Sequence, residues 1–269
     1  MSSKAPLAVA ALVSLFLVFN GWGLSLRPSN LVPGTSADHH PVVLELFTSE
    51  GCSSCPPADA FLKALDEAGH VNEVEIIAIE EHVDYWNRLG WSDPFSSHSW
   101  TERQEQYARA FRHDGVYTPQ LVINGRRELV GSSAPEARRN IIEAARIPGA
   151  DLRLSLTEVS RREAKFSIAV ENTPPEAQSA ELWLAVSERG LSSNVLHGEN
   201  EGRNLAHAAV LRSLTHVRSP RAESRGSATA TATVPLDASW KRENLRFVVF
   251  LQEPKTLHIF GAAACSASP

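Results

Sequence analysis

The sequence predicts an α/β domain over residues 41–148, followed by an all-β, sandwich-like domain over residues 149–269. The first segment alternates apolar strand patterns with amphipathic helix patterns, which is typical of strands joined by helical crossovers. The second segment shows only short alternating runs separated by turn residues, which is typical of a sandwich. The length of 269 residues also agrees with two domains.

Local signals place the first elements. The apolar run Val42–Phe47 predicts a strand. Pro56 and Pro57 then begin a helix that ends near Gly69, because proline at the first helical positions loses no hydrogen bond. Val74–Ile79 predicts a second strand, parallel to the first because a helix joins the two.

The later elements have similar signals. A capping-box pattern at Ser99 predicts a second helix that runs to about His113. Asn124-Gly125 predicts a β-hairpin with a type I′ turn, and a further capping pattern at Ser133 predicts a third helix. Seven strands are expected in the second segment: Leu152–Leu156, Lys165–Val170, Glu181–Val186, Ala208–Val217, Ala228–Val234, Leu245–Leu251 and Leu257–Ala262.

The N-terminal residues have the pattern of a targeting segment. Lys4 precedes the apolar run Leu7–Phe19, which predicts an export signal or a membrane anchor within residues 1–26. Residues 27–40 are rich in Pro, Ser, Gly and His, and we expect a linker there. We therefore expect an exported protein, periplasmic or secreted and possibly membrane-anchored, in an oxidising compartment. The net charge of −5 offers no basic surface for nucleic acid.

A C-x-x-C dithiol, Cys52 and Cys55, follows the first strand and precedes the first helix. Free backbone N–H groups at a helix N-terminus stabilise an anion, so we expect Cys52 to be the nucleophile and Cys55 the resolving thiol. A zinc site would need further ligands at suitable spacing, and the sequence has no second cysteine pair. Cys265, the remaining cysteine, is expected to pack as a small apolar residue or to stay a free thiol.

The order of elements, with C-x-x-C at the first helix and Thr118-Pro119 before the third strand, resembles the thioredoxin superfamily. The resemblance implies a cis peptide bond at Pro119 beside the dithiol, and it implies that Thr118 and Pro119 align a substrate backbone.

More specific runs resemble the domain-of-unknown-function family 1223, exported bacterial proteins with a thioredoxin-like core. These runs are Leu46–Asp59, His82–Trp86, Leu89–Trp91 and Tyr117–Gln120, together with Gly198–Asn200, Gly202-Arg203 and His207. The resemblance covers about residues 41–262. Glu199, Asn200, Arg203 and His207 are expected to form a polar site or an interdomain seam, with a structural network favoured.

Two acids near the dithiol are candidates for a role in its chemistry. Glu45 is near the place where thioredoxins keep a buried carboxylate that takes the resolving thiol's proton, but its spacing to the dithiol is one residue longer. The alternative is an exposed acid on an edge strand. Glu50 precedes Cys52 by two residues and disfavours a neighbouring thiolate, so Glu50→Gln is expected to lower the pKa of Cys52. Its alternative is a solvated loop acid.

An aromatic group is a candidate substrate surface beside the dithiol. It consists of His82, Tyr85, Trp86, Trp91 and Tyr117. Trp and Tyr are common at the centres of binding surfaces, although aromatic residues in such loops are also often packing residues.

These observations predict a thiol–disulfide oxidoreductase that acts on a protein or a small thiol through a mixed disulfide. We expect no cofactor other than the redox-active Cys52–Cys55 disulfide, no metal ligand, and a separate redox partner. One alternative is a chaperone or sensor for a soft metal such as Cu(I), held by both thiolates with His82 nearby. Another is a partner-binding module in which the disulfide is structural.

Overall fold

The computed structural model describes residues 1–2, 39–217, 221–224 and 227–267. The expected export signal or anchor in residues 1–26, and nearly all of the expected linker, therefore lie outside the described residues. Within the described part, none of the helices combines the length and the apolar character that a membrane span requires.

The first segment contains three helices, and each predicted element is present. Its elements are β1 (Val42–Thr48), α1 (Pro56–Ala68), β2 (His70–Val71), β3 (Val74–His82), α2 (His98–Phe111), β4 (Gln120–Ile123), β5 (Arg127–Val130) and α3 (Ala134–Ala144). β1 pairs with β3 in parallel and with β4 antiparallel, and β5 pairs antiparallel with β4. The strand order here is β3-β1-β4-β5.

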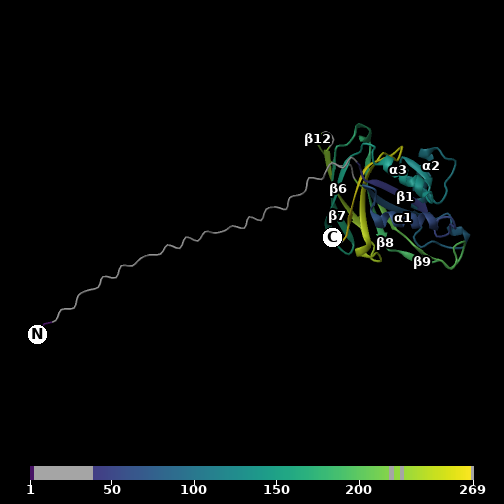
Figure 1. Cartoon of the computed structure of the whole chain (residues 1–269), viewed down its shortest axis with the longest axis horizontal. Coiled ribbons are helices and arrows are strands. Elements are labelled where there is room, and N and C mark those ends of the chain that lie inside the picture. Colours follow the sequence, from purple (N-terminus) through teal and green to yellow (C-terminus); the bar gives the residue numbers. More distant parts are fainter. Residues whose placement is uncertain (3–38, 218–220, 225–226, 268–269) are drawn as a thin grey trace. The chain divides into compact units, whose positions relative to one another are not determined.

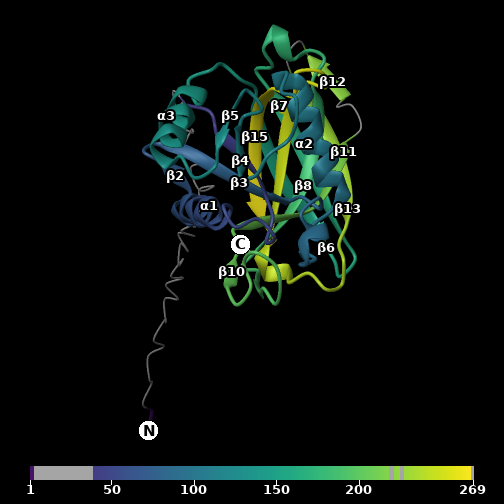
Figure 2. The same cartoon turned by 90° about the vertical axis from the view of Figure 1, so that its right-hand side faces the viewer.

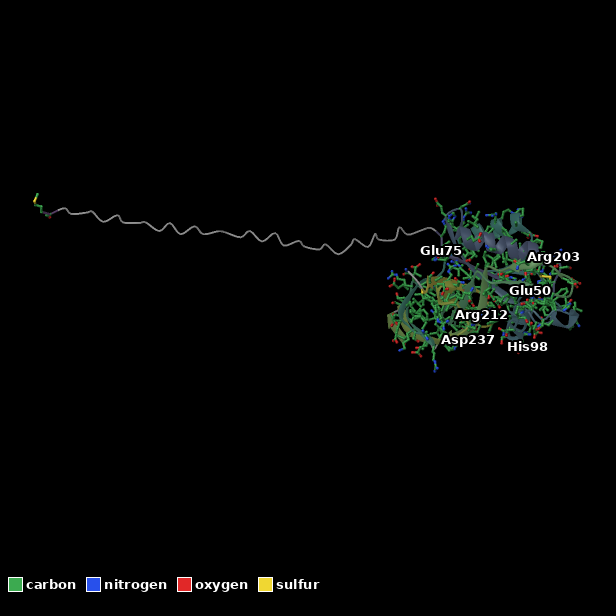
Figure 3. The ribbon with its side chains drawn as sticks, turned by 90° about the horizontal axis from the view of Figure 1, so that it is seen from below. Glu50, Glu75, His98, Arg203, Arg212 and Asp237 are labelled. Atoms are coloured by element: carbon green, nitrogen blue, oxygen red, sulfur yellow. A yellow bond between two sulfur atoms is a disulfide. The ribbon has the colours of Figure 1, made fainter. Side chains whose placement is uncertain are left out.

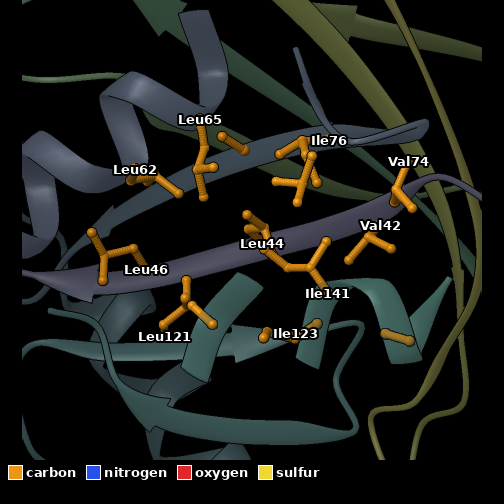
Figure 4. Close-up of a cluster of buried hydrophobic side chains, with 14 of the residues drawn as sticks. Val42, Leu44, Leu46, Leu62, Leu65, Val74, Ile76, Leu121, Ile123 and Ile141 are labelled. Carbon is orange, nitrogen blue, oxygen red and sulfur yellow. The ribbon is translucent and has the colours of Figure 1, made fainter. Parts of the chain in front are cut away.

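The two faces of β1 are covered by different helices, because successive side chains on a strand point to opposite faces. Leu44 and Leu46 pack with Leu62 and Leu65 of α1 and with Ile141 of α3, as Figure 4 shows. Val43 and Phe47 instead lie in apolar clusters that contain Trp100 and Tyr107 of α2. Alternate residues of β1 therefore pack against α1 and α3 on one face and against α2 on the other.

The start of α2 differs from the prediction. Ser97, not Ser99, is the N-cap, and its hydroxyl accepts a hydrogen bond from the Ser99 N–H at 3.3 Å. Ser133 is the N-cap of α3, but its side chain makes no capping bond. Ser97 has Trp100 three residues later and lacks the capping-box pattern that Ser99 and Glu102 have, so only the backbone conformation shows that Ser97 is the cap.

The hairpin turn has the backbone that its sequence predicts. Asn124 and Gly125 have φ angles of 46° and 61°, and a type I′ turn requires positive φ at both central positions. Glycine is also required at position 125 for steric reasons, because a Cβ there would lie 1.8 Å from the carbonyl oxygen of Leu257.

In its described residues, the second segment contains the seven expected strands and three short additional ones. They are β6 (Asp151–Val159), β7 (Glu163–Glu171), β8 (Glu181–Arg189), β11 (Ala209–Val217), β13 (Ser227–Pro235), β14 (Leu245–Gln252) and β15 (Ile259–Ser266). The additions are β9 (Ser192–Asn194), β10 (Asn204–Ala206) and β12 (Arg221–Ser224). β9 and β10 form a separate hairpin.

The two segments share one sheet, so the boundary expected between residues 148 and 149 does not separate two independently packed units. The order of the large sheet is β15-β14-β8-β11-β3-β1-β4-β5, and β11 joins β3 through the pair Val210 and Glu80. A four-stranded sheet, β12-β13-β7-β6, packs on its β8 and β14 part through an apolar core that includes Phe166 and Phe247. Figures 1 and 2 show β6 and β7 on the side away from α1 and α3.

Candidate functional site

The dithiol lies between β1 and α1 and forms a disulfide. Cys52 and Cys55 have Cα atoms 5.4 Å apart, and both side chains are fully buried. The Cys52 N–H donates to the Ser49 carbonyl at 3.1 Å, and Cys55 is the N-cap residue of α1. The Ser54 hydroxyl is 3.3 Å from the Cys52 sulfur, so it can donate a hydrogen bond to a thiolate there.

The start of α1 offers fewer free donors than the sequence argument assumed. Its first two residues, Pro56 and Pro57, have no N–H, and the Ala58 N–H already bonds to the Cys55 carbonyl at 2.8 Å. Stabilisation of a Cys52 thiolate therefore depends on the helix dipole and on the Ser54 hydroxyl.

The Thr118–Pro119 peptide bond is cis, as the resemblance implied. The indole N–H of Trp86 donates to the Thr118 hydroxyl at 2.8 Å, and a Cβ on Gly51 would lie 3.1 Å from the Trp86 Cβ. Trp86 therefore connects the loop that carries the cis proline with the residue before Cys52.

Residues from the second segment cover the dithiol loop. Asn200 is fully buried, and its amide donates to the carbonyls of Glu50 and Cys52, each at 2.9 Å. The exposed Glu199 carboxylate accepts a hydrogen bond from the Ser53 N–H at 3.1 Å, and the interactions with the Ser53 side chain and with this N–H lower the Glu199 pKa. We call the residues 191–207 that carry these contacts the covering segment. In Figure 3, Glu50 and Arg203 lie toward the same end of the described fold.

Five buried side chains next to the dithiol loop form what we call the histidine–carboxylate cluster: Glu50, Glu80, His82, Asp93 and His207. His207 bridges two acids, with Nδ1 2.8 Å from Glu80 and Nε2 2.9 Å from Glu50. His82 Nδ1 is 2.7 Å from Asp93, and its Nε2 is 3.4 Å from Glu80.

The charges in this cluster support one another. Burial alone would lower the pKa of His207, but the Glu80 charge and the hydrogen bonds of Glu80 and Glu50 outweigh burial and raise this pKa to about 9. Burial would likewise raise the pKa of Glu80, but His207 and His82 lower it to about 2. The charge of Asp93 raises the pKa of His82 well above its ordinary value against the effect of burial. The neighbouring carboxylates therefore favour the protonated form of both imidazoles.

Glu50 is not the solvated loop acid that formed the alternative interpretation. Its carboxylate accepts hydrogen bonds from the Trp91 indole at 2.8 Å and from the Ser193 hydroxyl, besides its contact with His207. Glu50 therefore lies in a buried ion pair with His207.

Asp59 is the acid on the helix that carries the dithiol, and the sequence reasoning missed it. It is four residues after Cys55, which places both on one face of α1, and its carboxylate accepts a hydrogen bond from the Thr48 hydroxyl at 2.6 Å. Burial and the neighbouring Glu80 charge raise its pKa to about 7. The i, i+4 spacing from Cys55 to Asp59 is the sequence signal from which this residue could have been found.

Glu45, the expected general base, lies on the other face of the sheet. It pairs with Arg103 of α2, whose Nε donates to it at 2.7 Å, and the Tyr107 hydroxyl also donates to it. The expectation that Glu45 is a base beside the dithiol is therefore corrected, because its side chain faces α2 and pairs with Arg103. The one-residue difference in spacing moved the side chain from the α1 face to the α2 face, because strand positions alternate.

The expected aromatic surface is only partly assembled. His82 is fully buried in the histidine–carboxylate cluster and is not at a rim. Tyr85 and Trp86 pack together with ring centroids 6.4 Å apart, and Trp91 is held by Glu50. The Tyr117 hydroxyl donates to Glu128. Of the expected group, Trp86 and Trp91 are the residues that contact the dithiol loop.

The remaining expectations concern the second segment. Cys265 is a free, half-buried thiol that packs against the apolar core between the two sheets, and burial raises its pKa. Glu199, Asn200 and His207 form the seam between the segments, and Arg203 joins it through its main chain, with the N–H donating to the Asn200 carbonyl at 3.1 Å.

Comparisons with known proteins place the chain in a family. Among solved structures, a protein of Agrobacterium tumefaciens is 27% identical, covers 84% of this chain and 94% of its own, and superposes with a TM-score of 0.62. HBP35 of Porphyromonas gingivalis is 15% identical, with 85% and 75% covered and a TM-score of 0.61, so this likeness concerns the fold alone. No curated protein matches the chain. The family model described as protein of unknown function (DUF1223) matches residues 43–252, and the chain belongs to this family.

Proposed function

We propose that this protein is a thiol–disulfide oxidoreductase of an exported compartment, with a thioredoxin-like first segment. The observation that carries the proposal is the Cys52–Cys55 disulfide at the start of α1, joined through Trp86 to the cis Thr118–Pro119 loop. The order β1-α1-β3-α2-β4-β5-α3 supports the same assignment of the fold.

The chemistry is a two-step exchange. A substrate thiolate attacks the Cys52 sulfur, the Cys52–Cys55 bond breaks, and Cys55 leaves as a thiolate. A second substrate thiol then attacks the mixed disulfide, so the substrate is oxidised by two electrons and Cys52 and Cys55 are reduced. Asp59, with a pKa of about 7, is suited to give a proton to Cys55 in this direction and to take it back in the reverse.

Access to the dithiol requires a change in the covering segment, because both sulfurs are buried. Asn200 and Glu199 hold the loop by hydrogen bonds, so the second segment controls which thiols reach Cys52. In this proposal the second segment limits the substrate range, and the partner is a thiol or disulfide carried by a protein or a small molecule.

Burial of both cysteines favours a second candidate, a partner-binding module in which the disulfide is structural. Equilibration of the protein with a glutathione series in metal-free buffer, read by mass-tagged alkylation, separates the two functions. We expect a two-electron transition of Cys52 and Cys55 that Cys52→Ser and Cys55→Ser abolish and that Cys265→Ser leaves unchanged. A disulfide that stays oxidised throughout the series would refute the redox proposal and favour the binding module.

A further inference from the structure

Three ligand-type side chains converge within the histidine–carboxylate cluster. Single atoms of Glu80, His82 and His207 all lie within 4.8 Å of one another. Glu80 Oε1 is at the centre of this group, 2.8 Å from His207 Nδ1 and 3.4 Å from His82 Nε2. A tetrahedral ion with bonds of about 2.0–2.2 Å needs ligand atoms about 3.3–3.5 Å apart, so small shifts bring these atoms to that spacing.

His82 provides an independent observation. Its Nε2 is fully buried and, within the described residues, has no hydrogen-bond partner, although it lies toward Glu80. Buried polar atoms nearly always have a partner, so an unpartnered imidazole nitrogen that faces two other ligand atoms needs an explanation. Coordination of a metal ion by Nε2 is an explanation of this kind.

The two imidazoles are held in the way that metal ligands are held. A ligating histidine usually gives its other ring nitrogen to a carboxylate, which sets the ring orientation. His82 gives Nδ1 to Asp93 at 2.7 Å, and His207 gives Nε2 to Glu50 at 2.9 Å. The nitrogen that remains on each ring faces Glu80. The ring of Phe95 lies edge-on to both imidazoles, at centroid distances of 5.5 and 5.3 Å, and provides an apolar wall.

The charge of the cluster also suits a divalent ion. Glu50, Glu80 and Asp93 supply three negative charges in a buried volume. A divalent ion bound at Glu80, His82 and His207 is attracted by these carboxylates at close range.

We propose that Glu80, His82 and His207 bind one divalent transition-metal ion of the zinc class. Imidazole and carboxylate ligands together favour such ions over Mg²⁺ and Ca²⁺, which prefer oxygen alone. The site uses no cysteine, so it differs from the Cu(I) alternative considered for the dithiol. It is also independent of the proposed redox function.

The test uses the full chain with Cys265→Ser and with the Cys52–Cys55 disulfide kept oxidised, so that no thiolate can bind metal. The protein is refolded with Zn²⁺ and desalted, and the retained metal is measured. We expect one Zn²⁺ per chain. His82→Gln and His207→Gln should each weaken Zn²⁺ binding at least about 100-fold, because loss of a ligand exceeds the effect of losing an outer carboxylate.

His216→Gln is the matched control, because His216 is a half-exposed histidine of β11 outside the cluster and should keep full binding. Failure of the folded, oxidised protein to retain Zn²⁺ overturns the proposal, and so does equal retention by His82→Gln. If both cluster variants misfold, X-ray absorption on the unsubstituted cluster decides. Nitrogen and oxygen ligands at about 2.0–2.1 Å with imidazole scattering support the site, and any other ligand shell refutes it. The glutathione titration tests the redox proposal separately.

Discussion

Two buried polar clusters occupy opposite faces of strand β3, and they are built in different ways. Glu80 and His82 point toward the α1 face and the dithiol, whereas Glu81 points toward α2. There it belongs to what we call the arginine cluster: Glu45, Glu81, Arg103, Tyr107 and Gln252. Adjacent residues of one strand thus serve two clusters.

The two clusters differ in the type of side chain that can carry the positive charge. A guanidinium does not lose its proton in proteins, so the positive charge of Arg103 is permanent. Burial raises the pKa of Glu81 well above its ordinary value, and Glu45 makes the shorter contact with Arg103, at 2.7 Å against 3.4 Å for Glu81. The histidine–carboxylate cluster instead contains imidazole side chains, which can gain and lose a proton. The arginine cluster is therefore a structural element, and the histidine–carboxylate cluster can change state beside the dithiol.

The largest effect is expected from removing the permanent cation. Arg103→Met leaves the Glu45 carboxylate buried without a partner charge, and we expect a loss of about 3–5 kcal/mol in the free energy of unfolding, measured with urea. Arg109→Met, on the exposed face of the same helix, should cost little. Addition of Glu45→Gln should recover part of the loss. A loss in Arg103→Met as small as in Arg109→Met would break the distinction between the clusters.

The second-largest effect is expected in the pH dependence of stability, through the ionisation of Asp59. Its pKa rises from 3.8 to about 7 on folding, so between these values the folded protein holds a proton that the unfolded chain has lost. Stability should therefore fall as pH rises through this window, by up to about 4 kcal/mol on account of Asp59. Asp59→Asn cannot ionise and should flatten this part of the pH profile. The exposed Asp114→Asn is the control, and identical slopes for Asp59→Asn and the unsubstituted protein would contradict the assignment.

A third prediction tests whether the covering segment guards the dithiol. Asn200→Ala leaves the carbonyls of Cys52 and Glu50 without their amide donor. Such a loss is worth about 1–2 kcal/mol, so reduction of the disulfide by dithiothreitol should become about 5–30-fold faster. Alkylation with a mass tag follows the reaction. Asn194→Ala, an exposed change in the same segment, should leave the rate unaltered, and an unaltered rate in Asn200→Ala would remove the guarding role.

The smallest effect is expected at the exposed rim. Glu199→Gln keeps an acceptor for the Ser53 N–H and removes only a solvent-screened charge. Its reduction rate should change by less than about twofold. A change as large as that in Asn200→Ala would mean that the charge of Glu199, and not the buried amide, holds the covering segment in place.

Local patterns determined much of the architecture. The three helices and the seven strands of the second segment follow from apolar periodicity and turn residues, which act over a few neighbouring positions. The positive φ angles at Asn124 and Gly125 follow from the residues alone. The position of the dithiol at the start of α1 also follows, because C-x-x-C stands directly between a strand pattern and a pair of prolines.

The site required the tertiary structure, for two physical reasons. The face on which a strand residue lies depends on register, so a one-residue difference in spacing placed Glu45 against α2, whereas Asp59 of α1 bonds to Thr48 on the opposite face of β1. Contacts between distant residues also have no local signal. His207 reaches Glu80 across 127 positions only because β11 pairs with β3, and Asn200 covers Cys52 for the same reason. The sequence by itself determined the elements and the position of the C-x-x-C pair, and only the pairing of the two segments decided what surrounds that pair.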